Sequence, residues 1–212
     1  DPLALVMLAD GSQLSARALS ATDEALAVET LDGLKAEVAW NQLKRLDFSA
    51  GKIQYLNVAL GAEEGTLLPD EEKVTEFLQL KTAFPAVRDF YRPRSNSWGV
   101  RRPLKLRGEI YDRGLALRSR TELLYRIRGK YRKFQAVVGI DDAVAGQSND
   151  LRLTILADGE PLFDELIRGT DAPRELDLDI EGVSRLDIKV DFGDDGLDSA
   201  DLLNLCEARV TK

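Results

Sequence analysis

Three polar segments between strand-like runs, residues 91–98, 141–150 and 191–198, carry side chains of the kind that hold a sugar. Carbohydrate binding needs an apolar ring for the C–H face of a pyranose and planar polar groups that bond neighbouring hydroxyls. Trp98, between Asn96-Ser97 and Gly99, could supply the ring, and packing against the edge of the core is the alternative. The polar candidates are Asn96, Asp141, Asp142, Gln147 and Asn149. Because loops cluster at the ends of a sandwich, we expect these side chains to contribute to one binding surface.

The third segment, residues 191–198, contains aspartates that could bind calcium. Asp194, Asp195 and Asp198 lie in a glycine-containing run, and calcium takes several carboxylate and carbonyl oxygens from such segments. Their spacing differs from that of an EF-hand loop. Asp141 and Asp142 could supply further oxygens. The sequence therefore indicates a structural calcium ion held by these aspartates, with an exposed acidic turn as the alternative.

The composition disfavours an enzyme. The chain has no histidine, which excludes Ser-His-Asp and Cys-His catalysis and histidine-based zinc sites. Cys206 is the single cysteine, and we expect it to pack as a small apolar side chain. A glycosidase needs two carboxyl groups about 5 to 9.5 Å apart across a cleft. Nearly all acidic residues here lie in turn-like segments or on charged strand faces, so we predict that the chain is not an enzyme.

Short apolar runs bounded by glycine or charge predict an all-β fold for the region after residue 100. Each run is only a few residues long, as strands of a sandwich are. The runs are Ile110-Tyr111, Gly114 to Leu117, Leu123 to Ile127 and Phe134 to Val138. They must position the polar segments named above.

A longer set of motifs runs through the same region. It consists of Leu106-Arg107-Gly108, Tyr111 to Leu115, Ser119, Tyr131 to Phe134, Gly139 to Asp142, Asp158-Gly159, Gly182 to Leu186 and Asp198 to Asp201. With these motifs the chain resembles the NPCBM domain family. The resemblance implies a galactose-binding-like, jelly-roll-like β-sandwich over roughly residues 51–212, of the kind appended to secreted enzymes and cell-surface proteins, with a carbohydrate as its ligand.

Arg118 departs from the family pattern, which often has a histidine after the Gly-Leu pair. An arginine there, beside Arg120 and near Arg101-Arg102, would favour an anionic glycan such as a uronate or a sulfate ester. The alternative is a salt bridge between Arg118 and the acidic C-terminal part of the chain.

Residues 1–50 have a pattern of their own. Two Asp-Gly pairs separate strand-like runs, which is a hairpin signal, and about five short strands fit within these residues. We expect a small N-terminal β unit, either a bent barrel of the Sm-like kind or a β-meander, followed by a boundary near Ser49-Ala50-Gly51. Acidic residues followed by apolar residues at helical spacing predict a short helix near 70–81.

Charge and hydropathy bear on partners and location. The 212-residue chain has a net charge of −8, and its basic residues are concentrated between Arg88 and Lys133, before an acidic C-terminal part. We expect these opposite charges to pair across strands, and we expect no nucleic-acid partner. No apolar run reaches the roughly 20 residues that a bilayer span requires. From the resemblance we expect an extracellular, periplasmic or cell-surface location after removal of a signal peptide.

These observations predict a non-catalytic carbohydrate-binding module of an exported or cell-surface protein. The competing hypothesis is a structural or protein-interaction module that has lost sugar binding and contacts other cell-surface proteins. Arg118 in place of histidine and the small number of exposed aromatic residues favour that alternative.

Overall fold

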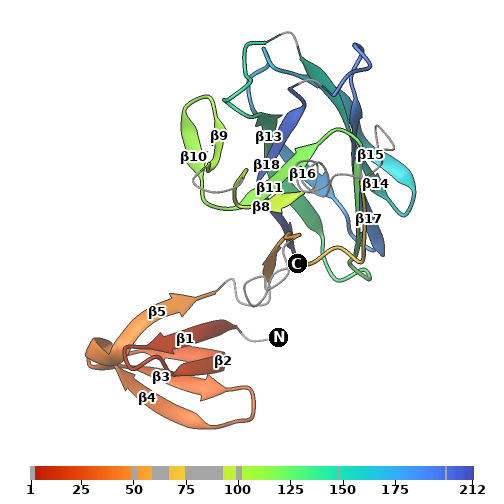
Figure 1. Cartoon of the computed structure of the whole chain (residues 1–212). Coiled ribbons are helices and arrows are strands. Elements are labelled where there is room, and N and C mark those ends of the chain that lie inside the picture. The colour runs from red at the N-terminus through yellow and green to blue at the C-terminus, as the bar shows by residue number, and fades with distance from the viewer. Residues whose placement is uncertain are drawn as a thin grey trace, which may run out of the picture. The chain divides into compact units, whose positions relative to one another are not determined.

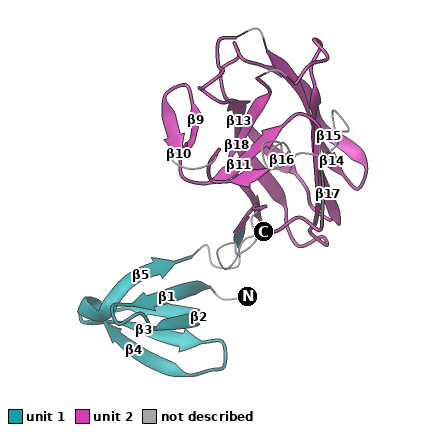
Figure 2. Ribbon diagram, viewed as in Figure 1, with its two compact units in different colours: residues 1–53 teal, residues 54–212 magenta. Residues whose placement is uncertain are grey.

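The chain is built of antiparallel β-strands, which confirms the predicted all-β class (Figure 1). The computed structural model describes residues 3–48, 52–58, 67–74, 93–98, 102–147, 149–198 and 200–212. The chain divides into two compact units, residues 1–53 and 54–212 (Figure 2). Within the described residues, no helix is long and apolar enough to cross a membrane.

The first unit is one sheet in the order β4-β3-β2-β1-β5. Its elements are β1 (Ala4–Leu8), β2 (Gln13–Ala21), β3 (Ala25–Thr30), β4 (Lys35–Ala39), the 3-10 turn η1 (Trp40–Gln42) and β5 (Leu43–Asp47). Four consecutive strands form a meander and β5 returns to lie beside β1. Alternate residues of β3 point inward, so Leu26 and Val28 join Val6 and Val38 in a small core.

The second unit contains two sheets. One has the order β16-β13-β18-β11-β8, with β6 also paired to β18, and the other has the order β15-β14-β17-β12-β7. The strands of the first sheet are β6 (Ile53–Tyr55), β8 (Arg94–Ser95), β11 (Gly114–Arg118), β13 (Lys133–Ile140), β16 (Arg174–Asp179) and β18 (Leu202–Thr211). Those of the second are β7 (Glu71–Val74), β12 (Thr121–Arg126), β14 (Asp150–Ala157), β15 (Glu160–Arg168) and β17 (Arg185–Phe192).

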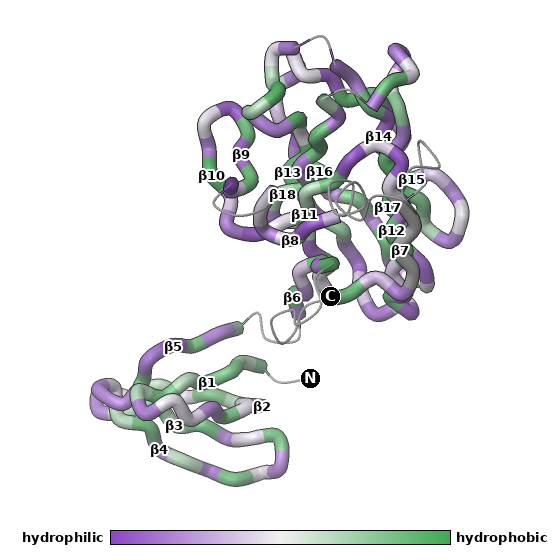
Figure 3. The backbone as a smooth tube through the Cα atoms, viewed as in Figure 1, coloured by the Kyte–Doolittle hydropathy of each residue, from purple (hydrophilic) through white to green (hydrophobic). Residues whose placement is uncertain are grey.

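The main core of the second unit forms from apolar residues of both sheets. Along β13, Phe134, Val138 and Ile140 are buried, and they pack in one cluster with residues such as Leu153 and Ile188 of the other sheet. Figure 3 shows hydrophobic stretches following the strands and hydrophilic residues in many of the turns. Because period-two alternation turns one face of each sheet inward, the expected sandwich is confirmed.

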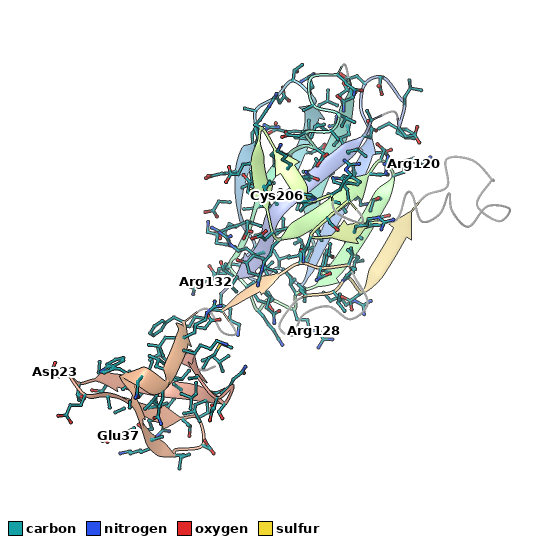
Figure 4. The ribbon with its side chains drawn as sticks, turned by 60° about the vertical axis from the view of Figure 1, so that its left-hand side comes forward. Asp23, Glu37, Arg120, Arg128, Arg132 and Cys206 are labelled. Atoms are coloured by element: carbon teal, nitrogen blue, oxygen red, sulfur yellow. The ribbon has the colours of Figure 1, made fainter. Side chains whose placement is uncertain are left out.

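A separate hairpin covers part of the outer face of the first sheet. It consists of β9 (Leu104–Leu106) and β10 (Glu109–Tyr111). Leu104 and Leu106 pack there against Ala116 and Cys206, which face away from the main core. Cys206 lies among the strands of this unit (Figure 4), is buried and unpaired, and burial raises the pKa of its thiol. Its predicted role as a small apolar side chain is confirmed.

The predicted helix near residues 70–81 is wrong for residues 71–74. These residues form β7, which pairs with β12 from Thr121↔Val74 to Leu124↔Glu71. Pairing with an edge of the second sheet outweighs the local helical spacing, as tertiary contacts often do. Residues 75–81 lie outside the described residues.

The predicted charge pairing across strands is visible in the second unit. Lys133 of β13 lies 3.3 Å from Asp177 of β16, and Lys189 of β17 lies 2.9 Å from Glu122 of β12. The register places each pair on neighbouring strands. Exposed pairs of this kind contribute about 0 to 1 kcal/mol each, so their role is mainly to relieve charge repulsion.

Candidate functional site

Trp98 lies on the outer face of the first sheet, after β8. Its backbone N–H donates to the carbonyl oxygen of Arg102 at 2.8 Å, and Ser97 forms a bridge with Pro103. The half-buried ring packs on the outer cluster around Leu104 and Cys206. Its Nε1–H donates to Oδ1 of Asn204 at 2.7 Å. The indole is therefore fixed in orientation, and part of the ring remains accessible.

Asn204 and Asp141 continue this contact into a buried polar chain. Asn204 has no exposed surface, and its Nδ2 donates to Oδ2 of Asp141 at 2.8 Å. The other carboxylate oxygen of Asp141 accepts from Arg102 at 3.0 Å and from the Ala143 N–H at 3.1 Å. The side-chain oxygens of Asp141 and the side-chain amide of Asn204 thus all have partners, as stable burial requires.

Arg118 joins the same surface from β11. Its guanidinium carbon lies 5.4 Å from the centre of the Trp98 ring, within the range of a cation–π contact. Arg102, about half exposed, lies on the far side of the Asn204–Asp141 link. The structure thus brings together Trp98, Arg118 and Asp141 of the predicted set, and it adds Arg102 and Asn204. We call these five residues the Trp98 cluster.

Asn204 is not among the residues predicted from the sequence, because it lies within an apolar strand. The run Leu202-Leu203-Asn204-Leu205-Cys206 reads as core, and a lone asparagine there is the only signal. Its side chain points outward with Cys206, while Leu203 and Leu205 point into the main core. A polar residue on the outward face of a buried strand signals a covering element that must hydrogen-bond it.

Three other predicted residues lie outside this cluster, and two of them make structural contacts. Oδ1 of Asn96 accepts from the Gly114 N–H at 3.1 Å, which holds β8 against β11. Asp142 accepts from the backbone N–H groups of Arg107 and Gly108 at 2.6 and 2.8 Å, so it holds the turn between β9 and β10. Gln147 is exposed in the segment after β13.

Gly114 shows how tightly β11 and β18 approach beside the cluster. Its φ is +144°, and a Cβ atom there would lie 2.4 Å from the Leu205 carbonyl oxygen. Only glycine satisfies both conditions. This residue therefore fixes the position of the strand that carries Arg118.

Asn149 belongs to a second, acidic group, formed where the chain enters β14 and β18. Its Nδ2 donates to the Ala200 carbonyl oxygen at 2.7 Å, next to Asp201. Asp201, which is 1% exposed, accepts a hydrogen bond from the Ser119 hydroxyl. Burial, together with the negative charges of Asp195, Asp198 and Asp150, raises the pKa of Asp201 to about 8, and Arg118 opposes this shift. Asn149, Asp150 and Asp201 form what we call the buried acidic group.

Three oxygens of the buried acidic group have no hydrogen-bond partner among the residues that the structure describes. They are Oδ1 of Asn149, Oδ1 of Asp150 and Oδ1 of Asp201. Buried acceptors without donors are costly, and a hard cation that takes carboxylate and amide oxygens would satisfy them. The donor set therefore fits calcium. Backbone carbonyl oxygens would complete the six to eight ligands that calcium takes.

The predicted calcium ligands Asp194 and Asp195 are exposed in the turn that follows β17, and Asp198 is half-buried. Oδ1 of Asp195 accepts from the Leu197 N–H at 2.9 Å, a contact typical of a turn. Within the described residues, no group of three or more Asp, Glu, Cys or His side chains is placed to hold a metal ion. The calcium site therefore stays a prediction. Its best-placed oxygens are those of the buried acidic group rather than those of the exposed Asp194 and Asp195.

Comparison with known proteins gives a family and a fold. A family model, described as NPCBM/NEW2 domain, matches residues 77–211. A protein of Renibacterium salmoninarum named "Putative endo-alpha-N-acetylgalactosaminidase" is 31% identical over 91 residues. This match covers 42% of the chain and only 6% of that protein.

Two solved structures share the fold. The CBM51 module of the Clostridium perfringens GH95 protein, in complex with methyl-galactose, has a TM-score of 0.56, with 20% identity over 68% of this chain and 95% of its own. The CBM51-2 and INT domains of Clostridium perfringens ZmpB, in complex with GlcNAc, have a TM-score of 0.58, with 16% identity over 98% of this chain and 43% of their own. At these identities the comparison supports the architecture alone.

Proposed function

The chain belongs to the NPCBM/NEW2 domain family, and we propose that it is a non-catalytic module that binds a glycan in an exported or cell-surface protein. Solved relatives of the same fold were obtained with methyl-galactose and with GlcNAc. The observation that carries the proposal is the Trp98 cluster, where the indole ring is fixed by Asn204 and approached by the Arg118 guanidinium, and where Arg102 is held by Asp141 at the other end of the cluster.

The chemistry of the Trp98 cluster suits a sugar. Because the indole N–H is already bonded to Asn204, the accessible part of the ring offers only apolar surface, which complements the C–H face of a pyranose. Arg102 is about half exposed and retains donors beyond its bond to Asp141. Such donors can bond hydroxyls or a carboxylate. The cluster therefore favours neutral or anionic glycans over cationic ones.

We propose a non-catalytic role because of where Asp201 lies, the carboxyl group whose pKa is most strongly raised among the described residues. A glycosidase acid must reach the glycosidic oxygen of its substrate. Asp201, whose pKa is raised to about 8, is 1% exposed and is bonded to Ser119. A group so deeply buried cannot protonate a polysaccharide.

We propose in addition that the buried acidic group holds a structural calcium ion. Asn149, Asp150 and Asp201 would supply side-chain oxygens, and Asp198 lies close enough to raise the pKa of Asp201. A bound cation would neutralise carboxylates that otherwise repel one another and would brace the segments after β13 and β17.

A glycan array followed by calorimetry tests the binding function. The array would include galactosides, N-acetylhexosamines, uronates and sulfated oligosaccharides, with calcium present. We expect Trp98→Ala to weaken binding of the best array ligand at least tenfold. Trp40→Ala is a matched control, because Trp40 is also partly exposed and donates through Nε1 to a backbone oxygen, of Thr22 at 3.1 Å.

Two results would contradict the proposal. An absence of saturable binding to every glycan class would favour the protein-interaction alternative. Equal losses in Trp98→Ala and Trp40→Ala would show that binding is not localised at the Trp98 cluster. Export is tested separately by locating the full-length protein in cell fractions.

A protein-interaction role is the second candidate, and the first unit provides the observation for it. Leu31 and Leu34, at the turn between β3 and β4, and Phe48 after β5 are 50%, 58% and 52% exposed. Exposed apolar side chains close together in one turn are typical of contact surfaces. If the first unit mediates association, Leu31→Ser with Leu34→Ser would lower the mass measured by light scattering at high concentration. An unchanged mass would argue against self-association through this turn.

A further inference from the structure

A hollow lies on the outer face of the larger unit, over β16, β13 and β18. It has a volume of about 230 Å³, and its polar lining comes from Gln135, Glu175, Asp177, Glu207 and Arg209. We call it the β13 groove. Arg209 and Asn204 of β18 pair with Gln135 and Gly139 of β13, which are four residues apart, so the two residues are about 13 Å apart at the usual rise of a strand. The hairpin β9–β10 packs on Cys206 between them, so the groove is distinct from the Trp98 cluster.

Planar polar side chains stand in a row across the groove. Arg209 Nε donates to Oε1 of Gln135 at 3.2 Å, and Gln135 Nε2 donates to Oδ2 of Asp177 at 3.3 Å. These residues are direct cross-strand partners in the register. Each retains further bonding capacity, and adjacent planar groups of this kind can bond neighbouring hydroxyls in pairs. The row is therefore preorganised for a polyhydroxylated ring.

A β-bulge turns another carboxylate toward the groove. The pairing of β13 with β18 shifts between Gln135 and Val137, and Glu207 occupies the extra position with a φ of +53°. Its N–H leaves the ladder and donates to the Arg113 carbonyl oxygen at 2.9 Å. A glutamate in left-handed conformation is uncommon, and bulges often redirect side chains at binding sites. Glu207 lines the groove as a result.

The charges of the groove select for a cation. Its walls hold the carboxylates of Glu175, Asp177 and Glu207 and one guanidinium, that of Arg209. Lys133 approaches Asp177 at 3.3 Å, and Arg209 approaches Glu207 at 3.6 Å. Among the described residues Glu175 makes no ion pair. The carboxylates thus exceed the cations, and this groove would repel the anionic glycans that suit the Trp98 cluster.

We propose that the β13 groove binds a sugar ring that carries a free amino group, as in a glucosamine oligomer. The row formed by Arg209, Gln135 and Asp177 would bond the hydroxyls, and Glu175 and Glu207 would attract the ammonium group. A volume of 230 Å³ is below the usual 300 to 1,000 Å³ of pockets for drug-sized ligands, so one ring would occupy it. This site is independent of the glycan site at Trp98.

Calorimetry on the full chain with a glucosamine trisaccharide tests the proposal. We expect saturable binding that is unchanged in Trp98→Ala and at least tenfold weaker in Glu175→Gln with Glu207→Gln. The fully N-acetylated trisaccharide should bind at least tenfold more weakly, because it lacks the ammonium group. The matched control is Glu160→Gln with Glu181→Gln, which removes the same charge from the exposed start of β15 and from the exposed turn after β16.

Several outcomes would overturn the proposal. The first four are an absence of binding, an equal loss in the control variant, equally tight binding of the N-acetylated trisaccharide, and equally tight binding of putrescine. An equal loss in the control variant would indicate a general effect of charge. Equally tight binding of the N-acetylated trisaccharide would show that the amino group is not recognised. Equally tight binding of putrescine would indicate an amine site that does not recognise the sugar. Binding lost only in Trp98→Ala would place the ligand at the Trp98 cluster instead. Thermal unfolding of each variant establishes that it is folded, and Gln135→Ala, which leaves the charge unchanged, provides a second test by an expected loss of affinity.

Discussion

The indole Nε1 of Trp98 lies 2.7 Å from the side-chain oxygen of Asn204, so a loop residue is tied to a buried strand residue far away in the sequence. The amide nitrogen of the same asparagine bonds Asp141 at 2.8 Å. The Asn204 amide therefore orients the ring of the proposed sugar site and also donates a hydrogen bond to the Asp141 carboxylate, which is 3% exposed. The stability of the unit and the geometry of the site share this residue.

Replacing Asn204 should destabilise the protein more than its size suggests. Asn204→Leu would leave an oxygen of Asp141 and the Trp98 N–H without partners, which costs about 2 to 4 kcal/mol. The free energy of unfolding, from urea titration followed by tryptophan fluorescence, measures this. Gln147→Ala, which removes an exposed amide, should change it by less than about 0.5 kcal/mol. If Asn204→Leu lowered the free energy of unfolding by no more than about 0.5 kcal/mol, the hydrogen bonds of Asn204 to Trp98 and Asp141 would not have the stabilising role described here.

Stability should depend on pH through Asp201. The pKa of this carboxyl is raised from 3.8 to about 8 in the folded protein, so the folded state binds more protons between these values. The unfolding free energy without metal should therefore fall as the pH rises from about 4 to about 8, and then level off. Asp201→Asn should flatten this fall. A profile measured in chelator that is the same in both proteins would disprove the assignment.

Calcium should stabilise the protein through the buried acidic group rather than through the exposed turn. A ligand at 100 times its Kd adds about 2.7 kcal/mol to the free energy of unfolding. We expect calcium to raise the midpoint of thermal unfolding of the wild-type chain, and Asp150→Ala to abolish that rise. Asp194→Ala removes an exposed aspartate of the neighbouring turn and should leave the rise intact. If Asp194→Ala abolished the rise and Asp150→Ala did not, the calcium site would lie in the turn after β17.

Glu207→Gly should make the protein more stable while it weakens the β13 groove. The left-handed φ of +53° costs a residue with a Cβ atom about 1 kcal/mol, and glycine avoids this. The lost contact with Arg209, 3.6 Å long and partly exposed, offsets little. We expect a gain of up to about 1 kcal/mol in urea unfolding, together with weaker binding of the glucosamine trisaccharide. A loss of stability would mean that the Glu207 carboxylate has a structural role.

The sequence by itself determined the class of fold and the family of this protein. Strand alternation and glycine turns act over a few neighbouring residues, so runs such as Leu123 to Ile127 and Phe134 to Val138 identify strands without any knowledge of their partners. The same local view was wrong for residues 71–74, because pairing of β7 with β12 depends on residues about fifty positions away.

Only the tertiary structure decided which polar residues meet. Trp98, Arg118 and Asp141 gather because Asn204 on the central strand β18 lies beneath them, and nothing in their spacing indicates this. Asn96 and Asp142, of the same chemical types, hold backbone N–H groups in place instead. The unsatisfied oxygens of Asp150 and Asp201 and the outward turn of Glu207 also result from strand register. Register and burial are set by long-range packing, which determines whether a polar side chain is structural or available to a ligand.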